Sequence, residues 1–103
     1  MYYYVYRITN KRLKKHYIGV RSSDIQPKKD LGYFYFSSST DQEFIIDQKQ
    51  NKKDYEYYII KEFKNRKESE DYESFLLEKY NCGLDERFYN KSTLDTIIKI
   101  FRH

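Results

Sequence analysis

Two short tyrosine motifs contain the side chains of this chain that are best suited to chemistry. The first is Tyr4–Tyr6 (YVY) and the second is Tyr17–Gly19 (YIG), which Arg21 follows two residues later. Side chains alternate between the two faces of a strand, so the tyrosines of the first motif share a face, and the tyrosine and glycine of the second share one with Arg21. Farther along the chain, a predicted helix carries Glu73. Phenol, guanidinium and carboxylate groups on one surface would suit metal-assisted cleavage of a phosphodiester bond.

Glu73 falls within the apolar side of its predicted helix. At about 100° per residue it lies beside Leu77 and Tyr80, whereas Glu78 points to the opposite side. A glutamate is seldom fully buried unless it is paired. One interpretation is that Glu73 sits at the edge of the apolar arc and pairs with a lysine or a tyrosine hydroxyl. The other is that it binds Mg²⁺, which takes one or two carboxylates and fills its remaining positions with water and substrate phosphate.

Gly19 and Arg21 each have a functional and a structural explanation. Glycine weakens a strand and often marks the close approach of a ligand or of another backbone, so Gly19 is a candidate substrate-binding residue. The alternative is a β-bulge. The guanidinium of Arg21 could clamp a phosphate with two hydrogen bonds and stabilise the charge that grows on it during cleavage. The alternative is a solvent-facing arginine without a role.

The connection between the two motif-bearing strands is basic. Its four cations have no acidic neighbour in the sequence: Lys11, Arg12, Lys14 and Lys15. They could contact backbone phosphates or keep an edge of the sheet soluble, and the sequence leaves both possibilities open. His16 is a candidate proton carrier, but its side chain is expected on the face opposite that of Tyr17.

Composition limits the class of protein. The 103 residues include 13 Tyr and 7 Phe, 35% are charged, and the net charge is +4. This length predicts one domain, 1–103, and so much aromatic area favours a folded domain over disorder. The charge is compatible with a polyanionic partner. The single cysteine, Cys82, excludes an internal disulfide and a cysteine-rich zinc site. Without a bilayer-length apolar run or a signal-peptide pattern, we expect a soluble, intracellular, cytoplasmic protein that does not bind membranes.

The pattern of apolar residues predicts an α+β fold. Strands are expected at 2–9, 16–21 and 55–63, and the first two form an antiparallel hairpin. Helices are expected at 41–50, 68–80 and 92–101. Thr40 and Glu43 would form a capping box for the first helix, and Gly83 would end the second. The stretch 22–39 is predicted to be irregular, and loops of this length are often functional.

In their order along the chain, these segments resemble the GIY-YIG nuclease family. Tyr4–Tyr6 resembles the first motif, with a tyrosine at its usual glycine, and Tyr17–Gly19 matches the second. The segment 72–77 (YESFLL) is similar to the family's glutamate-bearing helix, and Tyr89–Asn90 is similar to its asparagine motif. The segment 32–38 (GYFYFSS) looks like one found in a phage and viral branch of the family. The resemblance spans residues 2–90.

The resemblance implies a three-stranded antiparallel sheet flanked by helices and a metal-dependent DNA endonuclease. Glu73 would hold Mg²⁺ or Mn²⁺ against the scissile phosphate. Tyr17 or Tyr6 would position the attacking water and could deprotonate it, although a phenol with a pKa near 10 needs a neighbouring cation to act as a base. Arg21 would stabilise the transition state, and Asn90 would bind a phosphate or fix local structure.

The resemblance has one departure with consequences for activity. The family's usual arginine lies on a helix beyond the second motif, where this chain has Pro27, Lys28 and Lys29. Arg21 or one of these lysines would take over its electrophilic role, or that role would be weakened. Lys28 and Lys29 are also candidate substrate-binding residues. The chain shows no DNA-recognition module, so specificity would be low or would come from a partner or from self-association. The alternatives are a catalytically silent nucleic-acid-binding module and a protein-interaction domain with a tyrosine-rich surface.

Overall fold

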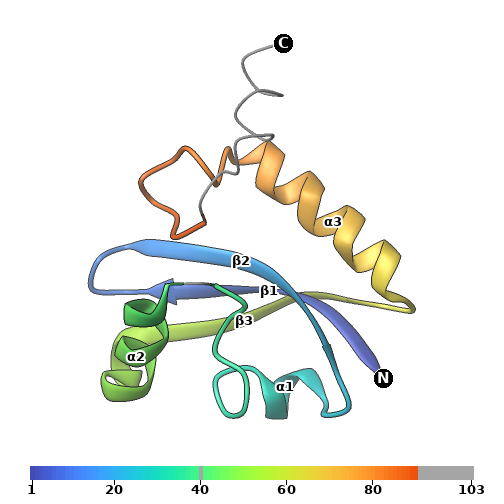
Figure 1. Cartoon of the computed structure of the whole chain (residues 1–103), viewed down its shortest axis with the longest axis horizontal. Helices are drawn as coiled ribbons and strands as arrows, with labels where there is room; N and C mark the ends of the chain where they lie inside the picture. The colour runs from blue at the N-terminus through green and yellow to red at the C-terminus, as the bar shows by residue number, and fades with distance from the viewer. Residues whose placement is uncertain (40, 91–103) are drawn as a thin grey trace.

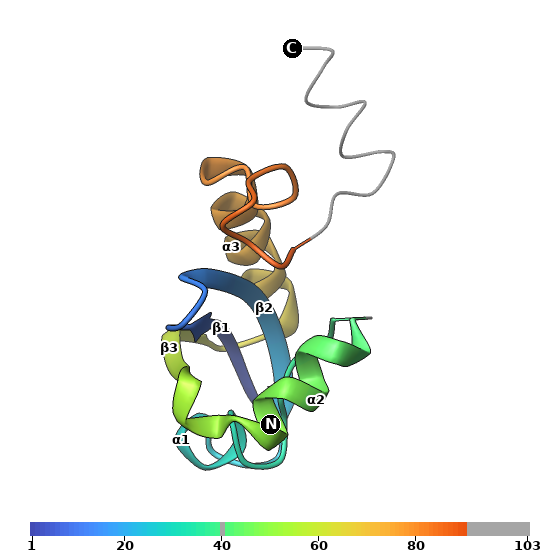
Figure 2. The same ribbon diagram turned by 90° about the vertical axis from the view of Figure 1, so that its left-hand side faces the viewer.

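A three-stranded antiparallel sheet with helices on both faces forms the body of the protein. The computed structural model describes residues 1–39 and 41–90. The strands are β1 (Tyr2–Asn10), β2 (Lys15–Ser23) and β3 (Tyr55–Phe63), in the order β2-β1-β3. The helices are α1 (Pro27–Asp30), α2 (Gln42–Gln50), the short 3₁₀ helix η1 (Lys52–Asp54) and α3 (Arg66–Lys79). Figures 1 and 2 show α3 on one face and α1 and α2 on the other. The predicted α+β sheet with flanking helices is confirmed.

The two tyrosine motifs pair with each other in the β1–β2 hairpin. Tyr6 lies opposite Gly19, Tyr4 lies opposite Arg21, and Ile8 lies opposite Tyr17. Directly opposed residues of an antiparallel pair project to the same face. The two groups of side chains predicted from the motifs therefore lie on a single face, the one that α1 and α2 cover.

The sheet has an apolar core on each face because helices cover both faces, and the central strand β1 contributes to both cores. The core under α1 and α2 includes Tyr4, Tyr6, Ile8, Tyr17, Leu31, Phe44 and Tyr55. The core under α3 includes Val5, Ile18, Val20, Leu76 and Cys82. A strand that is buried on both faces needs apolar or aromatic residues at consecutive positions, which explains the unbroken run at the start of the chain.

Both long helices differ from the prediction at their ends. The N-cap of α2 is Asp41, whose side chain accepts a hydrogen bond from the Phe44 amide, so the helix begins one residue later than a Thr40 cap would place it. Thr40 itself lies outside the described residues. The predicted Gly83 stop of α3 is wrong. Asn81 adopts a φ of 50°, and the Cys82 amide donates to the Leu77 carbonyl at 3.0 Å, so an asparagine provides the left-handed turn.

The stretch 22–39 is less irregular than the sequence suggests, because it contains α1 with Pro27 in its first turn.

After α3, the segment 81–90 runs back along β2 (Figure 1). Its backbone pairs with His16, which donates to the Arg87 carbonyl at 2.7 Å and accepts from the Tyr89 amide at 2.6 Å. The helix predicted at 92–101 lies outside the described residues. Within the described part of the chain, no helix has both the length and the apolar character needed to cross a bilayer.

Candidate functional site

Tyr6 and Tyr17 lie against each other over Gly19. Their ring centroids are 6.2 Å apart. A Cβ atom at Gly19 would overlap the Tyr6 hydroxyl and would lie 3.0 Å from Cε1 of Tyr17. The β1–β2 register is regular at this point, so the β-bulge explanation for Gly19 is wrong; the irregularity in the sheet lies between β1 and β3, at Val5 and Tyr6. The glycine therefore leaves room for a phenol ring of the protein itself.

A buried carboxylate, Asp30, anchors Arg21 on the same face. Asp30 is completely buried, and its Oδ2 accepts hydrogen bonds from the Tyr4 hydroxyl at 2.8 Å and from Nε of Arg21 at 3.1 Å. The Arg21 guanidinium also lies 4.2 Å from the centroid of the Tyr35 ring. The Arg21 side chain remains 33% exposed, and its Nη groups make no hydrogen bond to a described residue. Asp30 therefore fixes the Arg21 side chain and leaves its Nη groups accessible to a ligand. Arg21 is not a solvent-facing arginine without a role.

Four hydroxyl groups meet where the tyrosines approach the loop before α2. The Tyr6 and Tyr35 hydroxyls are 2.9 Å apart, and the Ser38 amide donates to the Tyr6 oxygen at 3.4 Å. The Tyr17 hydroxyl is 3.1 Å from Oγ of Ser38. We call these residues (Tyr6, Tyr17, Tyr35 and Ser38) the hydroxyl cluster. The neighbouring Ser37 has a φ of 140°, a strained conformation of the kind that collects at functional sites.

Tyr6 and Tyr17 differ in burial, and therefore in their ability to contact a substrate. Tyr6 is completely buried, whereas Tyr17 retains 9% exposure. Burial, and then the proximity of Tyr35 and Tyr17, raises the pKa of Tyr6 well above that of an ordinary phenol. A raised pKa and a closed environment conflict with direct proton abstraction by Tyr6. Of the two rings, only that of Tyr17 retains some exposure.

Glu73 projects from the helix on the opposite face of the sheet. It is half-buried on the sheet-facing side of α3, as the sequence predicts, while Glu78 is exposed. Nη1 of Arg66 donates to Oγ of Ser22 at 2.9 Å, which places this side of α3 beside β2. Glu73 follows Arg66 by seven residues and so lies on the same side of the helix. The structure thus brings Tyr6, Tyr17 and Arg21 together on one face, and Glu73 approaches β2 from the other.

The environment of Glu73 is unlike that of a paired carboxylate. Burial raises its pKa, the nearby Glu70 raises it further, and Arg66 lowers it. Its side chain makes no hydrogen bond or ion pair with any described residue, so no lysine or tyrosine hydroxyl among them is its partner. The described residues contain no group of three or more His, Cys, Asp or Glu side chains that could hold a metal ion. A cation at Glu73 would therefore take most of its ligands from water and substrate rather than from a cluster of described side chains.

The basic hairpin tip has acidic neighbours in space. Nη2 of Arg12 lies 3.7 Å from Asp47 on α2, and its Nε lies 3.5 Å from Asp54 on η1. The tip has no acidic neighbour along the sequence, but α2 and η1 pack beside the hairpin and bring these two aspartates to it. Lys15 places its amine 4.7 Å from the Tyr89 ring centroid. Four lysines remain as exposed or partly exposed cations on the hairpin and on α1: Lys11, Lys14, Lys28 and Lys29.

Asn90 clamps the outer edge of β2. Its Oδ1 accepts from the Ile18 amide at 3.0 Å, and its Nδ2 donates to the Ile18 carbonyl at 2.7 Å. Both polar atoms of the amide are therefore engaged by the backbone between Tyr17 and Gly19, which gives Asn90 a structural role. Nδ1 of His16 lies 2.8 Å from Oγ1 of Thr9 on the α3 face, opposite Tyr17 as predicted.

Three members of the site were missed by sequence reasoning: Asp30, Tyr35 and Ser38. All three lie in the stretch between β2 and α2. The length of that stretch suggested a functional loop, but no local pattern in it indicated that Asp30 would be completely buried. The parity of Tyr4 on β1 could have indicated a partner for its hydroxyl, because a buried tyrosine usually needs one.

Comparison of the chain with protein-family models, with curated proteins and with solved structures gives no significant match. The functional inference therefore rests on the geometry and on the sequence motifs.

Proposed function

We propose that this protein is a small Mg²⁺- or Mn²⁺-dependent endonuclease that hydrolyses phosphodiester bonds of DNA inside the cell. The observation that carries the proposal is the joint placement of Tyr6, Tyr17 and Arg21 on one face, over a glycine that leaves room for the stacked rings. The order of the motifs, which resembles that of GIY-YIG nucleases, supports the same function. Tyr4 occupies the position of that family's usual glycine, and its hydroxyl donates a hydrogen bond to Asp30.

Within this proposal, Tyr17 and Arg21 are the groups that touch the substrate. The Tyr17 hydroxyl, held by Ser38, orients the attacking water. The open end of the Arg21 guanidinium binds the phosphate and stabilises the charge that develops on its oxygens. Tyr6 is a positioning residue, because its buried ring supports Tyr17 and its hydroxyl holds the Ser38 backbone. Gly19 and Asn90 keep the backbone around Tyr17 in place. Lysines on the hairpin and on α1 contact flanking phosphates.

The carboxylate of Glu73, which has no partner among the described residues, fits a hard divalent cation. Mg²⁺ is usually held by one or two carboxylates and keeps several waters, so a single glutamate is chemically sufficient when substrate phosphate supplies further ligands. Burial penalises the free carboxylate, as its raised pKa indicates, and a bound cation would relieve that penalty. When bound, the ion supplies Lewis-acid stabilisation of the phosphate.

A second candidate is a nucleic-acid-binding module without catalytic activity. The observation that favours it is the separation of the groups, because Glu73 belongs to the helix that covers the face opposite Tyr17 and Arg21. The Asp30 carboxylate also neutralises part of the Arg21 charge. This candidate predicts salt-dependent DNA binding without strand breaks.

Nicking of supercoiled plasmid, with Mg²⁺ and with a chelator, tests the proposal. We expect the wild type to nick only with the metal. Loss of a catalytic hydroxyl or of a transition-state donor typically lowers the rate about 100-fold or more, so Tyr17→Phe and Arg21→Gln should fall by this amount. Glu73→Ala should be inactive.

Matched controls separate the site from general effects of substitution. Glu78→Ala removes an exposed glutamate from the same helix, and Tyr33→Phe removes an exposed tyrosine hydroxyl from the loop after α1. Both should nick as the wild type does. Absence of nicking by the wild type, or nicking undiminished in Glu73→Ala, would contradict the endonuclease proposal, and DNA binding without nicking would favour the second candidate.

A further inference from the structure

A second surface of chemical interest lies between α3 and the sheet, on the face opposite the hydroxyl cluster. A cavity of about 490 Å³ opens there between the three strands, α3 and the segment after it. The side chains that give it its character are Arg7, Tyr58, Phe75, Lys79, Tyr80 and Arg87. We call this cavity the Arg7 pocket. Its volume is within the range of natural ligand sites.

The charge of the Arg7 pocket has one sign. None of the described residues that line it is acidic. Arg87 is paired with Asp85 at 2.6 Å, but Arg7 and Lys79 make no ion pair with any described residue. Nε of Arg7 is buried and lacks a hydrogen-bond partner among the described residues. Burial and then the positive charges of Arg7 and Arg87 lower the pKa of His16, which also lines the pocket. An anionic group is the natural occupant of such an environment.

Exposed aromatic rings flank these cations. Tyr58 is 55% exposed, Phe75 54% and Tyr80 47%, so about half of each aromatic side chain faces solvent. The Arg7 guanidinium lies 5.2 Å from the Tyr58 ring centroid, and the Lys79 amine lies 5.8 Å from that of Phe75 and 5.4 Å from that of Tyr80. Planar ligand groups can therefore stack on rings that already have a cation beside them.

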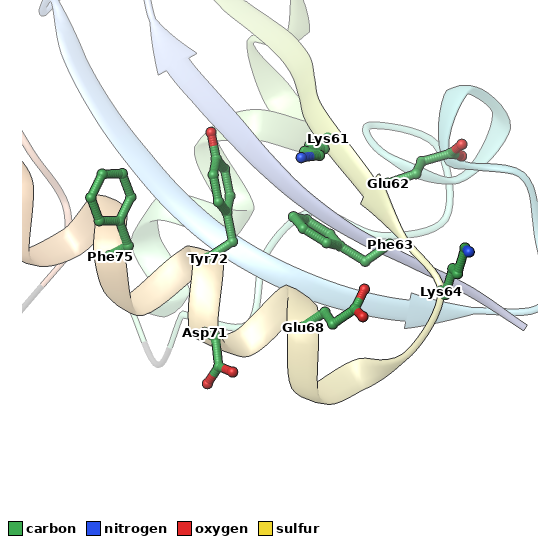
Figure 3. Close-up of a pocket in the computed structure, with 8 residues that line it drawn as sticks. All are labelled: Lys61, Glu62, Phe63, Lys64, Glu68, Asp71, Tyr72 and Phe75. Carbon is green, nitrogen blue, oxygen red and sulfur yellow. The ribbon is translucent and has the colours of Figure 1, made fainter.

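The aromatic surface continues from the Arg7 pocket along α3. Figure 3 shows Tyr72 and Phe75 side by side on the helix, with the Phe63 ring and the Lys61 amine facing Tyr72 from β3. This neighbouring hollow has mixed charge, because Glu62, Glu68 and Asp71 line it together with two lysines. Of the two hollows, the Arg7 pocket is thus the one whose charge favours an anionic ligand.

We propose that the Arg7 pocket binds an unpaired nucleotide of single-stranded nucleic acid, with the phosphate on Arg7 and Lys79 and the base on the ring of Phe75. Cations that follow a backbone, combined with aromatic rings that stack on bases, are the two features by which proteins hold single strands without sequence preference. This pocket is on the opposite face from Tyr17 and Arg21, so the inference does not depend on the proposed nuclease activity.

Fluorescence anisotropy with a labelled oligothymidylate, in chelator so that no metal-dependent cleavage can occur, tests this inference. A stacked base typically contributes enough that Phe75→Ala should weaken binding about fivefold to 100-fold. Lys79→Gln removes one phosphate contact and should make the slope of log affinity against log salt shallower by about 0.7. An oligonucleotide of equal length with abasic residues should bind the wild type at least about fivefold more weakly.

Two control variants match these substitutions on other parts of the surface. Phe34→Ala removes a phenylalanine that is 73% exposed in the loop after α1, and Lys53→Gln removes an exposed lysine from η1. Both should bind the oligothymidylate as the wild type does. Equal binding of the abasic strand, an equal effect of the control variants, or no binding by the wild type at low salt would overturn the proposal. Tighter binding of a polyglutamate peptide would identify an acidic protein segment as the occupant and would also overturn it.

Discussion

The substitution Gly19→Ala tests the packing on which the candidate site depends. A Cβ at this position would overlap the Tyr6 hydroxyl and press on the Tyr17 ring. Tyr6 cannot move aside freely, because it is completely buried and its hydroxyl is bonded to Tyr35 and to the Ser38 backbone. The alternative response, a shift of β2 away from β1, would disturb the hairpin register.

The expected loss of stability in Gly19→Ala is the sum of two destabilising contributions and one stabilising contribution. Overpacking a well-filled core costs about 1–3 kcal/mol, and disturbing the hydrogen bonds of Tyr6 costs about 1 kcal/mol more. Replacing glycine restricts the unfolded chain and offsets about 0.4–1 kcal/mol. We therefore expect Gly19→Ala to lower the free energy of unfolding by about 2 kcal/mol, which corresponds to a fall in Tm of roughly 10 °C for a domain of this size.

Urea unfolding followed by tyrosine fluorescence measures this change, since the chain has 13 tyrosines and no tryptophan to mask them. Gly83→Ala is the matched control, because Gly83 lies outside the sheet and its φ is not in the left-handed region. In a double-mutant cycle, adding Tyr6→Phe should make Gly19→Ala less costly by at least about 0.5 kcal/mol. The nearer of the two overlapping Tyr6 atoms, the hydroxyl oxygen, is then gone, and the ring, without its hydrogen bonds, can shift to relieve the overlap at Cζ. A Gly19→Ala variant as stable as the wild type, or strict additivity in the cycle, would refute the packing argument.

Three further predictions concern single side chains. Because burial raises the pKa of Glu73 above its ordinary value of 4.5, the folded state holds this proton more tightly than the unfolded state, so the free energy of unfolding falls as pH rises from that value through the raised pKa. Glu73→Gln should therefore be more stable than the wild type at neutral pH, and the difference should vanish below pH 4.5. Mg²⁺ should raise the Tm of the wild type but not that of the variant. The same pH dependence of stability in both proteins would contradict this prediction. Tyr4→Phe removes a donor to the buried Asp30 carboxylate and should cost about 2 kcal/mol in urea unfolding, whereas Tyr2→Phe, at an exposed position, should change little. Asn90→Ala frees both backbone groups of Ile18 and should speed hydrogen exchange of the Ile18 amide, an effect that Asn51→Ala should not produce.

The strands were predictable because their signal is local. Alternation and β-branched or aromatic enrichment located β3 at its observed bounds and both strands of the hairpin to within two residues. The ends of α2 and α3 were less predictable, because several capping residues stand close together in the sequence. Asp41 and Asn81 compete with their neighbours for the cap positions, and backbone geometry selects between them.

The residues of the candidate site likewise divide into those that local sequence patterns could place and those that they could not. The sequence by itself determined that Tyr17, Gly19 and Arg21 share a face and that Glu73 lies on the inner side of a helix, since strand and helix periodicity require no knowledge of distant contacts. Only the tertiary structure decided that Asp30 holds Arg21, that Arg12 has acidic neighbours, and that α3 covers the face opposite Tyr17. These features depend on which face of the sheet each helix occupies, and that choice is set by the packing of the whole chain rather than by any segment within it.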